Sequence, residues 1–299
     1  MKTLLRKSLI AAAGALLAAV GSLAAAATIV TSNNLLPGDT FTNPSSVNQG
    51  QAVGSSGWYY NNVRNGATVG IDQVFARHGN GSARFVGQDS ADKADLEYLA
   101  HAINLFGNFY ATGTLGSFSA LSSFGYEWYR SAASTSAGHL HPVMRVLLDA
   151  DGNLATTHDR GGLVYERVYN EAAGWAAATN SWVAESIGAS TYLWSFGLGL
   201  PFAADINGNG YGYDATLADW QMYLPSAVII GFSLGIGSGW GGDFLGAVDS
   251  ARWTIGGITS AFNFEVRQAG TVPEPASGAV LAAAWIAGIL VAKRRWRAA

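Results

Sequence analysis

The sequence predicts an all-β protein whose body is an antiparallel jelly-roll sandwich, with an N-terminal signal peptide and a C-terminal transmembrane helix at its ends. Two observations predict the fold class. Short runs of apolar and aromatic residues are separated along the body by Gly, Asn, Asp and Ser, and helical periodicity is weak. Strands do not alternate with long helices, as they would in a parallel sheet. The 299 residues include no cysteine, so the core must hold without disulfides.

We expect one domain over residues 28–271, because no linker rich in Pro or Ser divides it. Short helical turns are expected over Leu115–Leu121 and Thr216–Leu224. The strands expected in this domain, in chain order, are Gly57–Arg64, Ser82–Val86, Leu96–Ala100, Phe124–Arg130, Val143–Leu148, Leu163–Tyr169, Trp182–Ile187, Thr191–Phe196, Ala227–Leu234, Phe244–Ile255 and Phe262–Arg267.

The first 27 residues have the three parts of a secretory signal peptide. A basic stretch, Met1–Lys7, precedes the apolar run Ser8–Leu23, and the small residues Ala24–Ala27 follow. Small residues at this place suit the subsites of a signal peptidase. The alternative is a membrane anchor, but the run is rich in Ala rather than Leu or Ile and has no stop-transfer flank. We therefore expect export across the inner membrane.

The other end of the chain predicts a transmembrane helix over residues 276–292. All 17 residues are apolar or small, which is near the shortest length that spans a bilayer. A basic cluster follows and predicts a cytoplasmic tail by the positive-inside rule. Its members are Lys293, Arg294, Arg295 and Arg297.

Immediately before that helix stands the run Val272, Pro273, Glu274, Pro275. The two prolines keep this segment extended, so that a processing enzyme has access to it. Together with the apolar span and the basic tail, the motif resembles the PEP-CTERM sorting signal that exosortase recognises in Gram-negative bacteria. The resemblance implies a protein held transiently in the inner membrane and then moved to the cell surface or outside the cell.

Pieces of the body also look like the lectin-like sandwiches of exported PEP-CTERM proteins, for example Gly79–Phe85 and Thr216–Trp220. This resemblance implies the extracellular polysaccharide of a biofilm as environment and as binding partner. Nucleic acid is excluded as a partner, because Lys93 is the single lysine of an acidic body and nucleic-acid affinity depends on Lys and Arg. We expect a non-enzymatic surface or matrix protein.

The alternative is a secreted glycoside hydrolase that uses Glu127 and Glu166, which lie in expected strands among aromatic residues. If those strands pair, ion pairs with Arg130 and Arg167 are the simpler explanation. Other catalytic patterns are weak. The chain has no Gly-x-Ser-x-Gly motif, and the pair His139 and His141 lacks a third zinc ligand at a defined spacing.

A calcium loop is the one cofactor site that the sequence suggests. Asp205, Asn207, Asn209 and Asp214 offer oxygen ligands at alternating positions, with Gly where the chain must turn. The position of the usual bidentate Glu is taken by Thr216. A turn rich in Asn and Gly is therefore the alternative.

A glycan site is expected from aromatic residues in stretches rich in Gly, Asn and Ser, interpreted as loops. Aromatic rings at loop tips stack on sugar rings, although buried aromatics that fix large loops to the sandwich are the alternative. The candidates are Trp58, Tyr59, Tyr60, Trp175, Tyr211 and Trp240.

Overall fold

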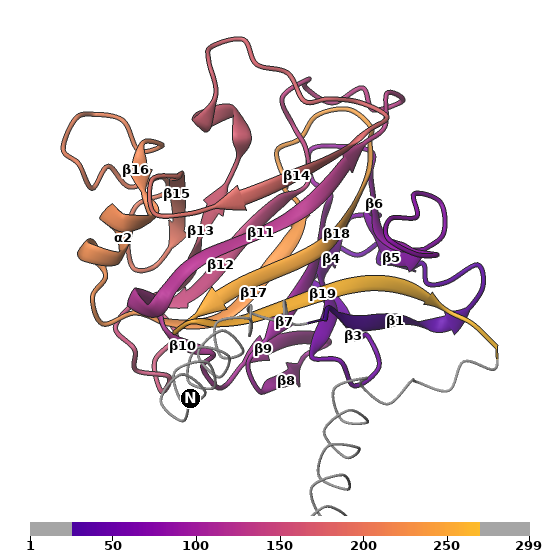
Figure 1. Ribbon diagram of the computed structural model, residues 1–299, viewed down its shortest axis with the longest axis horizontal. Coiled ribbons are helices and arrows are strands. Elements are labelled where there is room, and N and C mark those ends of the chain that lie inside the picture. The colour runs from indigo at the N-terminus through magenta and orange to yellow at the C-terminus, as the bar shows by residue number, and fades with distance from the viewer. Residues whose placement is uncertain (1–25, 270–299) are drawn as a thin grey trace, which may run out of the picture.

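The computed structural model describes residues 26–269, which form two β-sheets packed face to face (Figure 1). The body is therefore mostly β and sandwich-like, as expected. The expected signal peptide lies outside the described residues except for Ala26 and Ala27. The expected sorting motif at 272–275, the expected helix over 276–292 and the basic residues after it lie outside them as well. Within residues 26–269, no helix has the length and apolar character needed to cross a bilayer.

The first sheet has the order β1-β19-β18-β6-β5-β2, and β11 joins it by pairing with both β18 and β14. Figure 1 shows β14, β11 and β18 running side by side. The strands are β1 (Thr28–Leu35), β2 (Phe41–Thr42), β5 (Thr68–Asp72), β6 (Ser82–Gly87), β11 (Leu121–Arg130), β14 (Trp182–Ile187), β18 (Phe244–Ile255) and β19 (Ile258–Arg267).

The second sheet has the order β16-β15-β13-β12-β17-β7-β4-β3, with β10 paired to β17. It carries the candidate site described below. The strands are β3 (Gln49–Ala52), β4 (Trp58–Arg64), β7 (Lys93–Leu99), β10 (Gly116–Ser117), β12 (Val143–Asp149), β13 (Arg160–Tyr165), β15 (Tyr192–Gly197), β16 (Ala215–Thr216) and β17 (Val228–Ile236).

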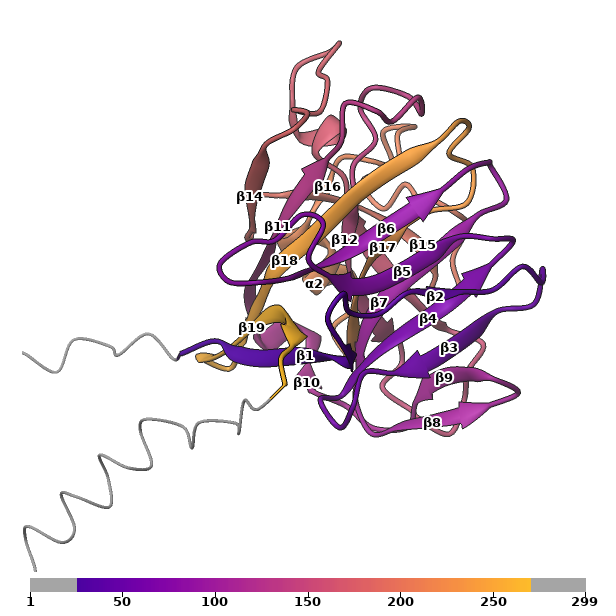
Figure 2. The same cartoon turned by 90° about the vertical axis from the view of Figure 1, so that its right-hand side faces the viewer.

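Outside the two sheets, a hairpin of β8 (Ala102–Leu105) and β9 (Asn108–Ala111) lies next to β3 and β4 (Figure 2). Helix α2 (Leu217–Tyr223) begins with a capping box, in which Thr216 and Asp219 exchange hydrogen bonds. Short 3-10 turns cover η1 (Phe118–Ala120) and η2 (Arg167–Asn170).

The core lies between the sheets and is rich in aromatic rings from both. Trp58 on β4 and Phe232 on β17 face Trp253 on β18, with ring centroids 6.0 and 4.2 Å from it. Trp58 also meets Phe264 of β19 edge to face at 5.0 Å. These rings are almost completely buried. Neighbouring residues of a strand point to opposite faces of the sheet. The residues next to these core rings along each strand therefore face outward from the sandwich.

Each expected strand has an observed counterpart, and Trp182–Ile187 and Phe244–Ile255 have the expected bounds. Two expectations were wrong in part. The strand expected over Leu163–Tyr169 ends at Tyr165, where the chain turns into η2, and the turn expected over Leu115–Leu121 is helical only at Phe118–Ala120. The sheets are also not purely antiparallel, because β1 pairs parallel to β19.

Candidate functional site

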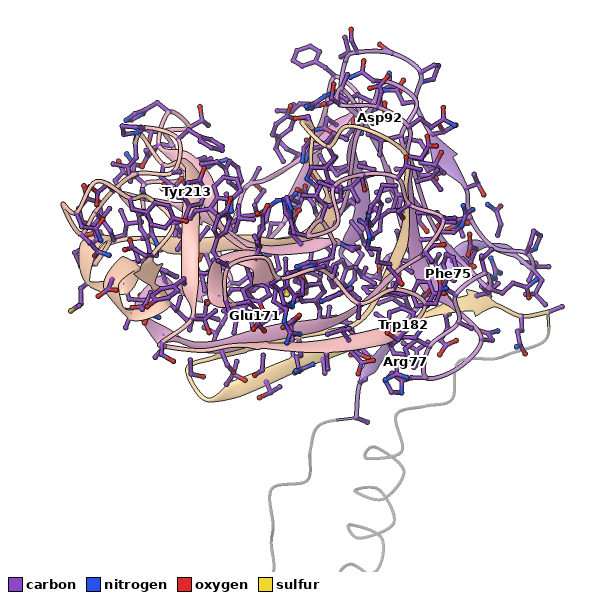
Figure 3. The ribbon with its side chains drawn as sticks, turned by 90° about the horizontal axis from the view of Figure 1, so that it is seen from above. Phe75, Arg77, Asp92, Glu171, Trp182 and Tyr213 are labelled. Carbon is purple, nitrogen blue, oxygen red and sulfur yellow. The ribbon has the colours of Figure 1, made fainter. Side chains whose placement is uncertain are left out.

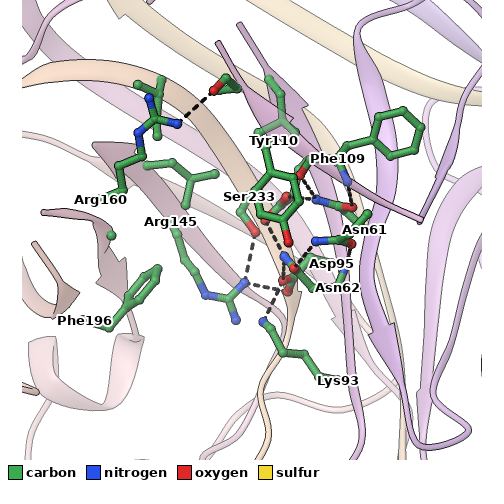
Figure 4. A pocket seen from close by; sticks show the side chains of 17 residues that line it. Asn61, Asn62, Lys93, Asp95, Phe109, Tyr110, Arg145, Arg160, Phe196 and Ser233 are labelled. Carbon is green, nitrogen blue, oxygen red and sulfur yellow. Dashed lines mark hydrogen bonds and ion pairs between the residues drawn. The ribbon is translucent and has the colours of Figure 1, made fainter. Parts of the chain in front are cut away.

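The outer face of the second sheet carries a cavity of about 310 Å³, shown in Figure 4. Its floor is formed by side chains of β4, β7, β12 and β17, and the β9 strand of the hairpin forms one wall. At the other side, Arg160 of β13 and Phe196 of β15 complete the lining.

Strand β7 supplies the charged groups of the floor by simple alternation. Lys93, Asp95 and Glu97 point into the cavity, while Ala94 and Leu96 point into the core. Asp95 and Glu97 are nearly completely buried. Such charges need partners, because desolvation without pairing is costly.

Asp95 is held by two cations (Figure 4). Lys93 Nζ lies 2.6 Å from Asp95 Oδ2, and Arg145 Nη1 donates a hydrogen bond to Asp95 Oδ1 at 2.9 Å. The same Arg145 nitrogen donates to Ser233 Oγ at 3.1 Å. Burial alone would raise the pKa of Asp95, but the charges of Lys93 and Arg145 outweigh it and hold that pKa below its usual value.

Glu97 has amide partners instead of cations. Asn61 Nδ2 donates to Glu97 Oε2 at 2.6 Å, and Asn62 Nδ2 donates to Glu97 Oε1 at 3.1 Å. Burial, with the negative charge of Asp95, raises the pKa of Glu97 to about 7. The floor therefore holds one carboxylate that stays ionised and one that titrates near neutral pH.

A β-bulge explains how two consecutive asparagines reach the same side. The register of β4 against β7 shifts between Asn61 and Arg64, and Asn62 has φ of 52°. Asn tolerates this left-handed conformation better than most residues. The irregularity turns the Asn62 side chain toward β7, where it reaches both Asp95 and Glu97.

The β8–β9 hairpin is attached to this floor. Asn62 N donates to Asn108 Oδ1 and Asn108 Nδ2 donates to Asn62 Oδ1, both at 3.0 Å. Asn61 bonds the backbone of Phe109 in both directions, at 2.9 Å each. Tyr110 of the hairpin lines the cavity and remains 46% exposed. The site thus combines buried polar groups with accessible aromatic surface.

The aromatic residues predicted to bind glycans do not lie together in this way. The interpretation of Trp58 and Tyr60 as loop residues was wrong, because both belong to β4 and their side chains are completely buried in the core. Trp240 is also buried, against Phe244. Trp58 and Tyr60 are two residues apart on β4, so both point inward, where a sandwich strand accommodates large rings.

Three of these candidates retain exposed surface. Tyr59 points outward from β4, and its ring lies 4.3 Å from that of Phe109. Trp175 is half-buried, with Arg167 Cζ 5.5 Å from its ring. Tyr211 is exposed and lies next to Tyr213, at 5.4 Å. None of the three is among the residues that line the 310 Å³ cavity.

Glu127 and Glu166 do not form a carboxylate pair. Strand β11 pairs with β14 and β18, not with β13, so the expected contacts of Glu127 and Glu166 with Arg130 and Arg167 do not form. Glu127 instead bonds Arg77 Nε at 2.5 Å on the outer side of the first sheet. Burial alone would raise the pKa of Glu127. The hydrogen bonds of Arg77 and His78 outweigh burial and lower that pKa. Figure 3 shows Arg77 next to Trp182, whose ring centroid is 5.8 Å from Arg77 Cζ.

Glu166 immediately precedes η2 and lies next to His141 and Trp240. His141 stacks on the core-facing ring of Trp128 at 4.5 Å. Burial raises the pKa of Glu166 to about 7 and lowers that of His141 to about 3. His139 is exposed and His141 is buried, so the two histidines do not form a shared metal-binding face.

The loop predicted to bind calcium is closed by its own hydrogen bonds. The Asp205 carboxylate accepts backbone N–H groups of Gly208, Asn209 and Gly210 at 2.7 to 3.2 Å. Asn209 Nδ2 donates to Asp214 Oδ2 at 2.6 Å, and Asn207 Nδ2 lies 3.4 Å from Asp214 Oδ1. These contacts are those of an Asx turn. Calcium binding here stays a prediction.

The residues of the cavity floor were absent from the sequence-based candidates. The run Lys93–Leu99 does carry a detectable signal, because charged and apolar residues alternate with period two. By contrast, the roles of Asn61 and Asn62 depend on a bulge, which the local sequence does not specify.

No protein-family model matches the sequence, and no curated protein shows significant similarity to it.

Proposed function

We propose that the body binds carbohydrate without cleaving it, and that the cavity on the outer face of the second sheet is the binding site. The proposal rests on the hydrogen-bond network on the cavity floor, beside the exposed ring of Tyr110. Its members are Asp95, Glu97, Asn61 and Asn62. Carboxylates and amides bind sugar hydroxyls, and aromatic rings stack on sugar rings. A concave site with a few fixed polar groups is typical of small-ligand binding.

The charge of the site favours neutral sugars. Lys93 and Arg145 are both bonded to Asp95, so neither cation is left to bind an acidic substituent. Lys93 and Arg145 offset the charges of Asp95 and ionised Glu97, so the floor has no unpaired positive charge that would select a carboxylated or sulfated glycan. We therefore propose neutral polysaccharide as the ligand class.

Hydrolysis of a glycoside by Asp95 and Glu97 is the second candidate function. The observation that favours it is the divergence of the two pKa values, lowered for Asp95 and about 7 for Glu97. Both carboxylates accept from Asn62 Nδ2, so the bonded oxygens are no more than about 6 Å apart, near the separation of about 5–5.5 Å in retaining glycosidases. Glu97 would be the general acid and Asp95 the nucleophile.

One experiment separates the two functions. The full chain is screened by affinity electrophoresis against neutral and acidic polysaccharides, and each polysaccharide that retards it is assayed for release of reducing ends. Binding without release supports the first function. Release that disappears in Glu97→Gln supports the second, whereas release that persists in that variant excludes this carboxylate pair as its cause. No retardation by any neutral polysaccharide would contradict the binding proposal.

We further propose that the chain is exported, anchored transiently in the inner membrane and processed by an exosortase-type enzyme. The sequence features of residues 1–27 and 272–299 support this proposal. We also infer a jelly-roll arrangement of the sandwich, because successive segments alternate between the sheets. Strands β4, β7, β12 and β15 belong to the second sheet, and β6, β11 and β14, which lie between them along the chain, belong to the first.

A further inference from the structure

Three aspartates gather where β12 and β13 are joined, at one end of the second sheet. Asp149 ends β12, and its register partner Arg160 begins β13, so the hairpin brings Asp159 next to Asp149. The loop folds back, and Asp151 N donates to Asp159 Oδ2 at 2.9 Å. One oxygen from each of the three carboxylates lies within 4.8 Å of the others.

Two of these carboxylates are buried with an oxygen left without a partner. The side chains of Asp149 and Asp159 are 0% and 9% exposed. Their Oδ2 atoms are occupied by Arg160 Nε and by the Asp151 amide. Their Oδ1 atoms accept no hydrogen bond within residues 26–269. A buried carboxylate oxygen in this state is costly unless a ligand completes it.

The local charge is not balanced by the surrounding side chains. Arg160 compensates one of the three carboxylates, at 3.0 Å from Asp149. His158 Nδ1 is 3.9 Å from Asp159 Oδ1, and the His158 ring is mostly exposed. The carboxylates of Asp149, Asp151 and Asp159 lie close enough to repel one another. A bound cation would remove this repulsion.

We propose that Asp149, Asp151 and Asp159 bind a calcium ion. All three ligands are carboxylate oxygens, which are the donors of hard cations, whereas typical zinc sites include His or Cys ligands. Ca²⁺ accepts the irregular arrangement of oxygen ligands that a loop offers, whereas Mg²⁺ requires near-ideal octahedral geometry. The exposed Asp151 provides the side from which the ion enters.

The loop is held in a shape that suits such a site. Gly152 has φ of +74°, and a Cβ there would lie 2.6 Å from the backbone oxygen of Ser226. Asp151 Oδ1 accepts the Asn153 amide at 2.7 Å, which fixes the carboxylate of Asp151 over the turn. Since Arg160 also lines the carbohydrate cavity, the calcium site would brace one wall of that cavity from behind. The proposal itself does not depend on carbohydrate binding.

The test is calorimetric titration of CaCl₂ into the chelator-treated full chain, with thermal unfolding in calcium and in chelator alongside. We expect one calcium per chain and a higher melting temperature with calcium. Asp151→Asn removes a charge at an exposed position and keeps the size and shape of the side chain. It should weaken calcium binding at least tenfold, and so should Asp159→Asn. Asp205→Asn alters the other candidate loop and is the matched control, so its affinity should equal that of the unaltered chain.

Three results would overturn the proposal. The first is the absence of calcium binding at millimolar concentration. The second is loss of calcium binding in Asp205→Asn while Asp151→Asn still binds as the unaltered chain does. The third is an affinity for MgCl₂ equal to that for CaCl₂. If Asp159→Asn does not fold, Asp151→Asn decides the outcome, because its side chain has no place in the core.

Discussion

Asp95 and Glu97 lie two residues apart on β7 and accept hydrogen bonds from the same nitrogen, Asn62 Nδ2, at 2.9 and 3.1 Å. They differ in their other partners, since Asp95 has two cations and Glu97 has a second amide. The two cations keep Asp95 ionised, whereas burial and the negative charge of Asp95 move the titration of Glu97 to near neutral pH.

The first prediction concerns the pH dependence of stability. A carboxyl whose pKa is raised on folding to about 7 contributes stability that is fully present below its unfolded pKa, near 4.5, and is lost as pH rises toward 7. Glu97→Gln removes the titrating group, so it should flatten that part of the curve. Its Nε2 cannot accept the hydrogen bond of Asn61 or Asn62, which lowers stability by a similar amount at every pH.

Urea unfolding between pH 5 and pH 8 measures this effect. Glu127→Gln is the control, because the pKa of Glu127 is lowered and its removal should not flatten the curve. Glu166 and Asp249, whose pKa values are also raised to about 7, leave a residual slope of the same sign. An unchanged slope in Glu97→Gln would contradict the assigned titration of Glu97.

The second prediction concerns His141, which is buried in the neutral form. Its pKa is lowered to about 3, chiefly by burial, so its contribution to stability is present above pH 6.5 and is lost as pH falls below that value. The loss approaches about 1.4 kcal/mol per pH unit for one such group. His141→Gln should therefore lose less stability than the unaltered protein between pH 6 and pH 4. A steeper loss in the variant would refute this role.

The third prediction distinguishes core aromatics from accessible ones. Trp58→Ala should lower the free energy of unfolding by about 3–5 kcal/mol, because it empties a space between the two sheets. Tyr211→Ala, at an exposed position, should change it by less than about 0.5 kcal/mol. Similar small effects of both substitutions in urea unfolding would mean that Trp58 is not in the core.

Much of this architecture could be predicted from alternation and turn residues. Strands such as Trp182–Ile187 were found because a short run with aromatic and β-branched residues is bounded by turn residues. The start of β7 was missed because Lys93 and Asp95 resemble a surface loop until their cavity is known. A strand was expected over Gly57–Arg64, but Trp58 was also interpreted as a loop residue because Gly and Ser precede it. The structure confirms the strand and not the loop.

The candidate site was less predictable, since it depends on contacts between distant parts of the chain. Asn61 and Asn62 reach Glu97 through a bulge, and Asn108 reaches Asn62 from a separate hairpin. The pairing of β11 with β14 and β18 also had no local signal. Because β13 is not a neighbour of β11, Glu127 meets Arg77 and not Arg167.

The fourth prediction concerns sorting. Replacing Pro273, Glu274 and Pro275 by alanine should leave the full-length chain in the inner membrane, because the extended motif is proposed to be what the processing enzyme recognises. Cell fractionation with an antibody against the body measures the outcome. Processed protein at the cell surface or in the medium from the altered gene would show that the assignment of residues 272–275 is wrong.

The most direct test of the central claim is a calorimetric titration of the full chain with the neutral polysaccharide that retards it most strongly. Three tyrosine variants are compared, all at exposed positions. Tyr110→Ala removes a ring at the cavity, Tyr223→Ala removes a ring of matched exposure, 48% against 46%, on α2, and Tyr211→Ala removes one from the Asp205–Asp214 loop.

Tyr110→Ala should weaken binding by about tenfold, or about 1.4 kcal/mol, through loss of stacking on the sugar. Tyr223→Ala and Tyr211→Ala should bind as the unaltered chain does. Equal affinity of Tyr110→Ala and the unaltered chain, or a loss confined to Tyr211→Ala, would contradict the assignment of the binding site to the cavity on the second sheet.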